Sequence, residues 1–179
     1  MKKIPLRSLF IWFCVSVIPF GLAACATVGI TDKHPMHSFS FDTLHDSPDA
    51  EVLDYQYGSS RQFGTHANAE MVALGQVFPG WNTSGPMPQG EFLYVKWRIK
   101  NRMKPWEYIG TYEDKVDLKN RLPPDIANCG IHFVVKGAQL YVYLIPPPGV
   151  WPAGALKPSA PESMSAYLKQ HQIYPDQPK

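Results

Sequence analysis

The residues that most clearly specify a chemistry are Leu22, Ala23, Ala24 and Cys25. Small residues directly before a cysteine form a bacterial lipobox, in which the cysteine thiol accepts a diacylglyceryl group and the chain is cut just before it. The new α-amino group is usually acylated as well. Each buried CH2 contributes about 0.8 kcal/mol, and two acyl chains already give a stable anchor. We therefore expect Cys25 to be the lipid attachment site of a membrane-anchored protein.

The segment before Cys25, residues 1–24, has the layout of a cleaved secretory signal. Three basic residues stand among the first seven, an apolar stretch occupies 9–20, and small residues follow it. That stretch is shorter than the roughly 20 residues of a membrane-spanning helix. The alternatives are an ordinary signal peptide or a short anchor helix with an incidental cysteine. The residue after the cysteine is Ala26 rather than aspartate, so we expect a lipoprotein of the outer membrane that faces the periplasm.

A second set of residues that can do chemistry lies between 32 and 46, because imidazole and carboxylate groups bind zinc and similar ions. No regular pattern predicts a helix or strand here, and prolines at 35 and 48 interrupt the segment. We interpret residues 25–50 as a flexible tether with solvated histidines, and we expect no metal site and no cofactor. The six residues are Asp32, His34, His37, Asp42, His45 and Asp46.

Two further groups are candidates for acid, base or nucleophilic chemistry. Glu113, Asp114 and Asp117 form a carboxylate cluster, but they alternate with apolar residues, which predicts a solvated strand face. Cys129 and His132 are three residues apart, a spacing that does not fix the geometry of an activated thiol. We expect Cys129 to be an inert, partly buried turn residue.

Established catalytic motifs do not occur in this sequence. It contains no G-x-S-x-G nucleophile elbow, no H-E-x-x-H zinc motif, no phosphate-binding glycine loop and no dinucleotide fingerprint. We therefore expect a protein that is not an enzyme.

Charge and cysteine content restrict the partners and the fold. Without residues 1–24, the chain has 14 basic and 15 acidic residues and no concentrated basic stripe, so we do not expect it to bind nucleic acid. Only Cys25 and Cys129 remain of the three cysteines, and Cys25 is acylated, so an internal disulfide is not expected.

The elements that must position any site are mostly strands. Residues 91–100 are the clearest, because Leu93, Val95, Trp97 and Ile99 alternate with polar residues. The runs 131–135 and 140–145 flank Lys136-Gly137-Ala138, which predicts a β-hairpin. We also expect strands at 51–57 and 107–118, a short helix or strand at 68–77, an irregular loop at 79–90, and a short helix from 159 to about 170.

Together these elements predict one domain over 51–179 of the α+β or mainly β class. Its expected architecture is a small antiparallel sheet with a central hairpin and a short C-terminal helix.

Aromatic residues are abundant and serve either core packing or partner recognition. Trp81 lies in a Pro/Gly-rich segment and Trp106 in the Lys104-Pro105-Trp106 segment, which we expect to be a turn. Irregular surface segments often carry recognition. Trp81 and Trp106 are therefore the candidate partner-binding residues.

Trp81 and the segments 92–98, 112–118, 131–137 and 140–144 follow one strand and hairpin pattern. In this pattern the chain resembles small proteobacterial lipoproteins of unknown function that are found beside type VI secretion phospholipase effectors. Such proteins look like immunity proteins, which bind the cognate lipase in the periplasm. The resemblance implies a lipoprotein that neutralises a cognate phospholipase effector. The alternative is a structural or accessory lipoprotein of the cell envelope without a toxin partner.

Overall fold

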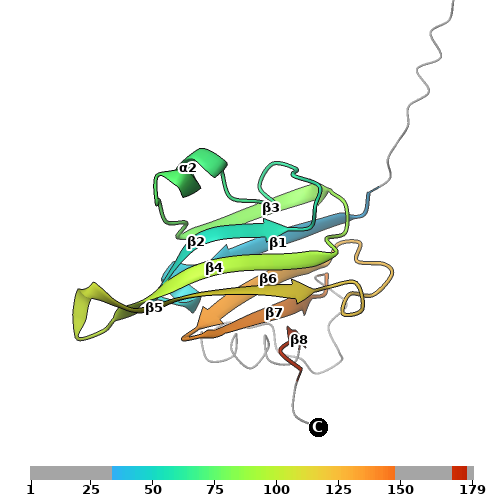
Figure 1. Cartoon of the computed structure of the whole chain (residues 1–179). Helices are drawn as coiled ribbons and strands as arrows, with labels where there is room; N and C mark the ends of the chain where they lie inside the picture. The colour runs from blue at the N-terminus through green and yellow to red at the C-terminus, as the bar shows by residue number, and fades with distance from the viewer. Residues whose placement is uncertain (1–33, 148–170, 177–179) are drawn as a thin grey trace, which may run out of the picture. The chain divides into compact units, whose positions relative to one another are not determined.

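Alternating apolar residues build two β-sheets that pack face to face (Figure 1). The computed structural model describes residues 34–147 and 171–176. Its elements are β1 Met36–Asp42, α1 Thr43–Asp46, β2 Ala50–Tyr57, α2 Ala69–Ala73, β3 Gly80–Pro86, β4 Phe92–Asn101, β5 Lys104–Asp117, β6 Gly130–Lys136, β7 Gln139–Ile145 and β8 Gln172–Tyr174. The order of strands is β3-β1-β6-β7-β8 in one sheet and β2-β4-β5 in the other. The predicted class, α+β or mainly β, is confirmed.

The core lies between the two sheets and is rich in aromatic rings. Phe39 of β1 stacks on Tyr57 of β2, with ring centroids 5.1 Å apart, and thereby joins the two sheets. Phe41 stacks on Phe133 at 4.6 Å. Trp97 of β4 is fully buried in the same cluster. Burial of such large side chains is the main source of stability of this fold.

Most neighbouring strands are antiparallel, as predicted, but β1 and β6 run parallel, with Phe39 opposite Ile131. The predicted hairpin of β6 and β7 is confirmed, because Val135 pairs with Leu140 across the turn. Gly137 in that turn has φ 57°, a conformation that glycine adopts without steric cost.

The prediction of a flexible tether over residues 25–50 is wrong from Met36 onward. β1 lies inside the five-stranded sheet between β3 and β6, and α1 and the start of β2 follow within the same range. Phe39 and Phe41 are buried, while the intervening Ser38 and Ser40 are only partly covered. The segment is a strand because this alternation buries one of its faces.

The prediction of an irregular loop over 79–90 is also wrong in part. β3 pairs with β1 along its whole length, from Met36 opposite Pro86 to Asp42 opposite Gly80. The segment 68–77 contains the helix α2, which Asn68 caps through its side-chain oxygen. The helix predicted from 159 to about 170 lies outside the described residues. Neither helix of the described segments has the length and apolarity to cross a membrane.

Candidate functional site

The most prominent surface feature is the far end of the β4–β5 hairpin, a two-stranded ribbon that projects beyond the sandwich (Figure 1). β2 pairs with β4 only as far as Ile99. Residues 100–109 continue past that point. The ribbon lies at the end of the sandwich opposite the start of β1 (Figure 1).

Three apolar side chains of this ribbon are open to solvent, and we call them the apolar tip. Met103 is 88% exposed, Trp106 76% and Ile109 65%. None of them belongs to the core formed by the described residues. Large exposed apolar side chains, tryptophan above all, are candidate contacts for a partner.

The backbone of the ribbon is irregular where the apolar tip lies. Asn101 accepts a hydrogen bond of 3.0 Å at Oδ1 from the N–H of Met103, and this contact closes the turn. On β5, residues 105–107 and Ile109 lie between registered pairs and have no partner position on β4. The expectation that Lys104-Pro105-Trp106 is a turn is therefore wrong, because these residues begin β5 and the turn is at 102–103. Trp106 lies on a bulge that turns its side chain outward.

Each positive charge close to the apolar tip has an acidic partner. The distance between Arg102 and Asp49 is 2.5 Å, and that between Lys104 and Glu107 is 3.0 Å. The apolar tip therefore lies in locally neutral surroundings.

A partly buried ion pair network lies where the ribbon leaves the sandwich. Glu51 contacts Arg98 at 2.7 Å and Lys100 at 2.8 Å, and the guanidinium of Arg98 lies 4.0 Å from the ring centre of Tyr108. Burial raises the pKa of Glu51, but the hydrogen bonds and positive charges of Lys100 and Arg98 outweigh it, so the net pKa is lowered. Ion pairs therefore stabilise the base of the ribbon in addition to the backbone hydrogen bonds of the sheet.

Trp81, the other predicted contact residue, lies on the edge strand of the five-stranded sheet and only 36% of it is exposed. Its indole packs edge-on against Phe63, with ring centroids 5.7 Å apart. A Cβ atom at Gly64 would lie 2.6 Å from the Trp81 Nε1 atom. Trp81 and Trp106 therefore lie on different sheets and form no common cluster.

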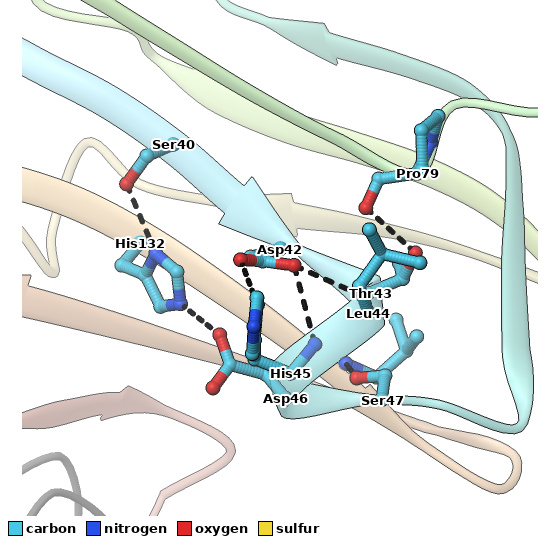
Figure 2. A network of polar contacts seen from close by, with 10 residues as sticks. Ser40, Asp42, Thr43, Leu44, His45, Asp46, Ser47, Pro79 and His132 are labelled. Carbon is cyan, nitrogen blue, oxygen red and sulfur yellow. Dashed lines mark hydrogen bonds and ion pairs between the residues drawn. The ribbon is translucent and has the colours of Figure 1, made fainter.

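A polar network on the five-stranded sheet joins residues that are distant in sequence (Figure 2). Ser40 Oγ and His132 Nδ1 are 2.9 Å apart, and His132 Nε2 and Asp46 Oδ2 are 3.0 Å apart. The sequence does not reveal this network, because its members are separated by 92 and 86 positions and no local spacing predicts such a contact.

Ser40, His132 and Asp46 are hydrogen-bonded in the same order as a Ser-His-Asp catalytic triad. Whether such a network is catalytic or structural depends on its surroundings. An acyl-transfer site also needs free N–H donors for the oxyanion. The nearest helix start is that of α1, and there Asp42 Oδ1 already accepts the N–H groups of Leu44 and His45 (Figure 2). We interpret the network as a clasp that holds α1 against β1 and β6.

Of the six residues considered for metal binding, Asp32 lies outside the described residues. The other five do not form a common group. His37 is 3% exposed, and its Nε2 atom lies 3.1 Å from the hydroxyl of Tyr57. This histidine is therefore a buried side chain rather than a solvated one. His45 pairs with Asp42 at 2.6 Å instead. In the described ranges, no group of three or more His, Cys, Asp or Glu side chains is placed to hold a metal ion.

The other candidates for chemistry have structural surroundings. Cys129 is half-buried beside β6, and burial raises the pKa of its thiol, which disfavours the reactive thiolate. Asp114 accepts a hydrogen bond of 2.8 Å from the hydroxyl of Tyr174 and so ties β5 to β8. Glu113 accepts one of 3.2 Å from Tyr94.

Comparisons with family models, with curated proteins and with solved structures give no match for this chain.

Proposed function

We propose that the mature chain is a lipid-anchored envelope protein that binds a partner protein through the apolar tip. The observation that carries this proposal is the 76% exposure of Trp106, together with that of Met103 and Ile109, on a projecting ribbon. Tryptophan and methionine are enriched at protein interfaces, and tryptophan is prominent among residues that dominate binding energy.

The partner class comes from the resemblance to lipoproteins found beside type VI secretion phospholipase effectors. A phospholipase that enters the periplasm attacks the membrane, and acylated Cys25 would hold the binding domain at that membrane. A tight complex of this kind buries on the order of 1,600 Å2 in total. The proposed function is therefore that of an immunity lipoprotein.

The test starts from the genes that flank this one. If one of them encodes a phospholipase effector, that effector is directed to the periplasm and co-expressed with the full chain. We expect survival of the cells and co-purification of the two proteins. A variant in which a cleavable secretory signal without a lipobox replaces residues 1–25 carries no acylated thiol and leaves the folded domain unchanged, so it should retain binding and lose membrane association. If the full chain neither protects the cells nor binds the effector, a structural or accessory role in the envelope replaces this proposal.

A further inference from the structure

The free edge of β3 is an unprotected hydrogen-bonding edge. β3 ends the strand order of the five-stranded sheet, and it contains no charged residue and no register shift against β1. The other three edges of the described sheets are protected: Phe78 and His66 bridge to β2, β5 carries Lys104, Pro105 and a bulge, and β8 has only three residues. Charge, proline, bulges and shortness are the features that prevent strand addition, and β3 lacks them between 80 and 85.

The pairing of β3 with β1 determines which backbone groups point to the free edge. The N–H of Thr43 donates to the carbonyl of Pro79, and the N–H of Met87 donates to that of Pro35. In an antiparallel pair, opposite residues alternate between those that exchange hydrogen bonds and those that do not. The register therefore turns the backbone groups of the even-numbered residues of β3 away from β1 and towards solvent. These residues are Gly80, Asn82, Ser84 and Pro86.

These edge groups form a short ladder with Asn82 at its centre. On one side the ladder ends at Pro86, which has no N–H and whose carbonyl accepts a hydrogen bond of 3.1 Å from Gln62 Nε2. On the other side it ends at Phe78, whose N–H donates to the carbonyl of Val52 in the other sheet. In the part of the chain that the structure describes, three donors and three acceptors of this edge therefore remain free, spaced evenly around Asn82.

We propose that β3 pairs with β3 of a second copy of this chain, antiparallel and centred on Asn82, so that two five-stranded sheets join into one. A two-fold axis through this pair places Asn82 opposite Asn82 and Gly80 opposite Ser84, and each free donor then meets a free acceptor. Trp81 lies opposite Thr83 of the second copy. The pairing brings no like charges together, because β3 contains none. This inference does not rest on the proposed function, and it does not use the apolar tip.

The expected lipid anchor is compatible with such a pair. Met36 lies opposite Pro86, four positions from Asn82, so the two β1 strands begin about 30 Å apart in the paired form. Ten residues separate Cys25 from Met36, and a segment of that length reaches at most about 36 Å. Two anchors in one membrane therefore fit the pair, and confinement to one surface raises the effective concentration of the second copy.

Disulfide cross-linking of the full chain in whole cells tests the pair and its register. In the proposed register the two Asn82 Cα atoms lie about 5.5 Å apart, within disulfide range, whereas the two Ser84 Cα atoms lie about 14 Å apart. Both side chains are exposed. After oxidation with copper phenanthroline, we expect Asn82→Cys to give a disulfide-linked dimer on non-reducing gels, and Ser84→Cys, the matched control, to give at least about fivefold less. The unaltered chain, which keeps Cys129, gives the background. Equal yields for the two variants, no dimer above background, or a cross-link of Asn82→Cys only to a different protein would overturn the proposal.

Sedimentation velocity of the purified full chain in detergent provides a second measurement. Asn82→Lys sets two positive charges directly opposite each other at the two-fold axis, while Asn82→Thr keeps a neutral side chain that suits a strand. Asn82 is exposed, so neither substitution alters the core. We expect a concentration-dependent dimer for the wild type, association weakened at least about tenfold in Asn82→Lys, and a change of less than about threefold in Asn82→Thr. A monomeric wild type, or equal association of the wild type and Asn82→Lys, would show that this edge does not join two copies.

Discussion

The indole Nε1 of Trp97 donates a hydrogen bond of 2.9 Å to the carbonyl oxygen of Gly137. Trp97 lies on the inner face of β4 in the three-stranded sheet, and Gly137 lies in the turn between β6 and β7 of the other sheet. One side chain therefore fills the core and also fixes the position of the opposing hairpin turn. Substitutions of Trp97 can therefore distinguish the contribution of side-chain packing to stability from that of the hydrogen bond.

Trp97→Phe should destabilise the protein because the ring volume falls and the Gly137 carbonyl loses its donor. We expect the unfolding free energy to drop by about 1–3 kcal/mol, and by about 3–5 kcal/mol for Trp97→Ala, which leaves a cavity. Urea denaturation of the mature domain, followed by circular dichroism, measures both. A loss below about 0.5 kcal/mol for Trp97→Phe would contradict the role of the bond.

His37 should make stability depend on pH. Burial lowers the pKa of His37 from its ordinary value of 6.5, although the hydrogen bond to the Pro35 carbonyl opposes this. As the pH falls, the unfolded chain therefore takes up a proton before the folded protein does. The stabilisation is complete above about pH 6.5, and it is lost as the pH falls through the folded pKa.

His37→Gln should flatten the decline in unfolding free energy between pH 7 and pH 5, as measured by urea denaturation at several pH values. His171, whose pKa burial also lowers, should leave part of the decline in place. His34→Gln is the matched control, since it removes a histidine three positions away at the edge of β1. An unaltered pH profile for His37→Gln would show that the buried imidazole does not control the acid response.

The strands that the sequence predicted are those with a strong alternation of large apolar and polar residues. β4 is such a strand, with Leu93 and Val95 buried, and the β6–β7 hairpin is another. β1 was missed although Ser38 and Ser40 alternate with Phe39 and Phe41, because this alternation is short, because the buried position before it is the polar His37, and because histidines, aspartates and a proline surround it. β3 was missed since it is an edge strand with few core side chains, and its pairing with β1 depends on long-range contacts.

The candidate site was predictable only in part. The setting of Trp106 among basic and proline residues left an exposed and a buried role open, and the structure places it on the surface. Met103 and Ile109 were not singled out, because their exposure depends on where β4 and β5 leave the sandwich. The Ser40, His132 and Asp46 network depends on the parallel pairing of β1 with β6, which no local pattern specifies.

The clasp between Asp46 and His132 should contribute to stability rather than to catalysis. A half-buried hydrogen bond with a charged group contributes roughly 1 kcal/mol. We expect Asp46→Asn and His132→Gln each to lower the unfolding free energy, and the double variant to lose less than the sum, with a coupling of about 0.5–1 kcal/mol. Additive losses would show that the two side chains do not act on each other, and hydrolysis of p-nitrophenyl acetate that disappeared with Ser40→Ala would instead assign the network to catalysis.

Position 90 requires glycine because the Tyr57 ring occupies the space that a side chain would need. A Cβ atom at position 90 would overlap Tyr57 Cε2 and lie 2.7 Å from Cζ, and the ring is held between Phe39 and His37. Gly90→Ala should therefore cost about 1–3 kcal/mol of unfolding free energy, because a buried ring must move. Tyr57→Val makes room at this position, so Gly90→Ala should cost much less in that background. Urea denaturation of the four proteins gives the comparison, and an equal cost in both backgrounds would mean that contact with the Tyr57 ring is not what requires glycine.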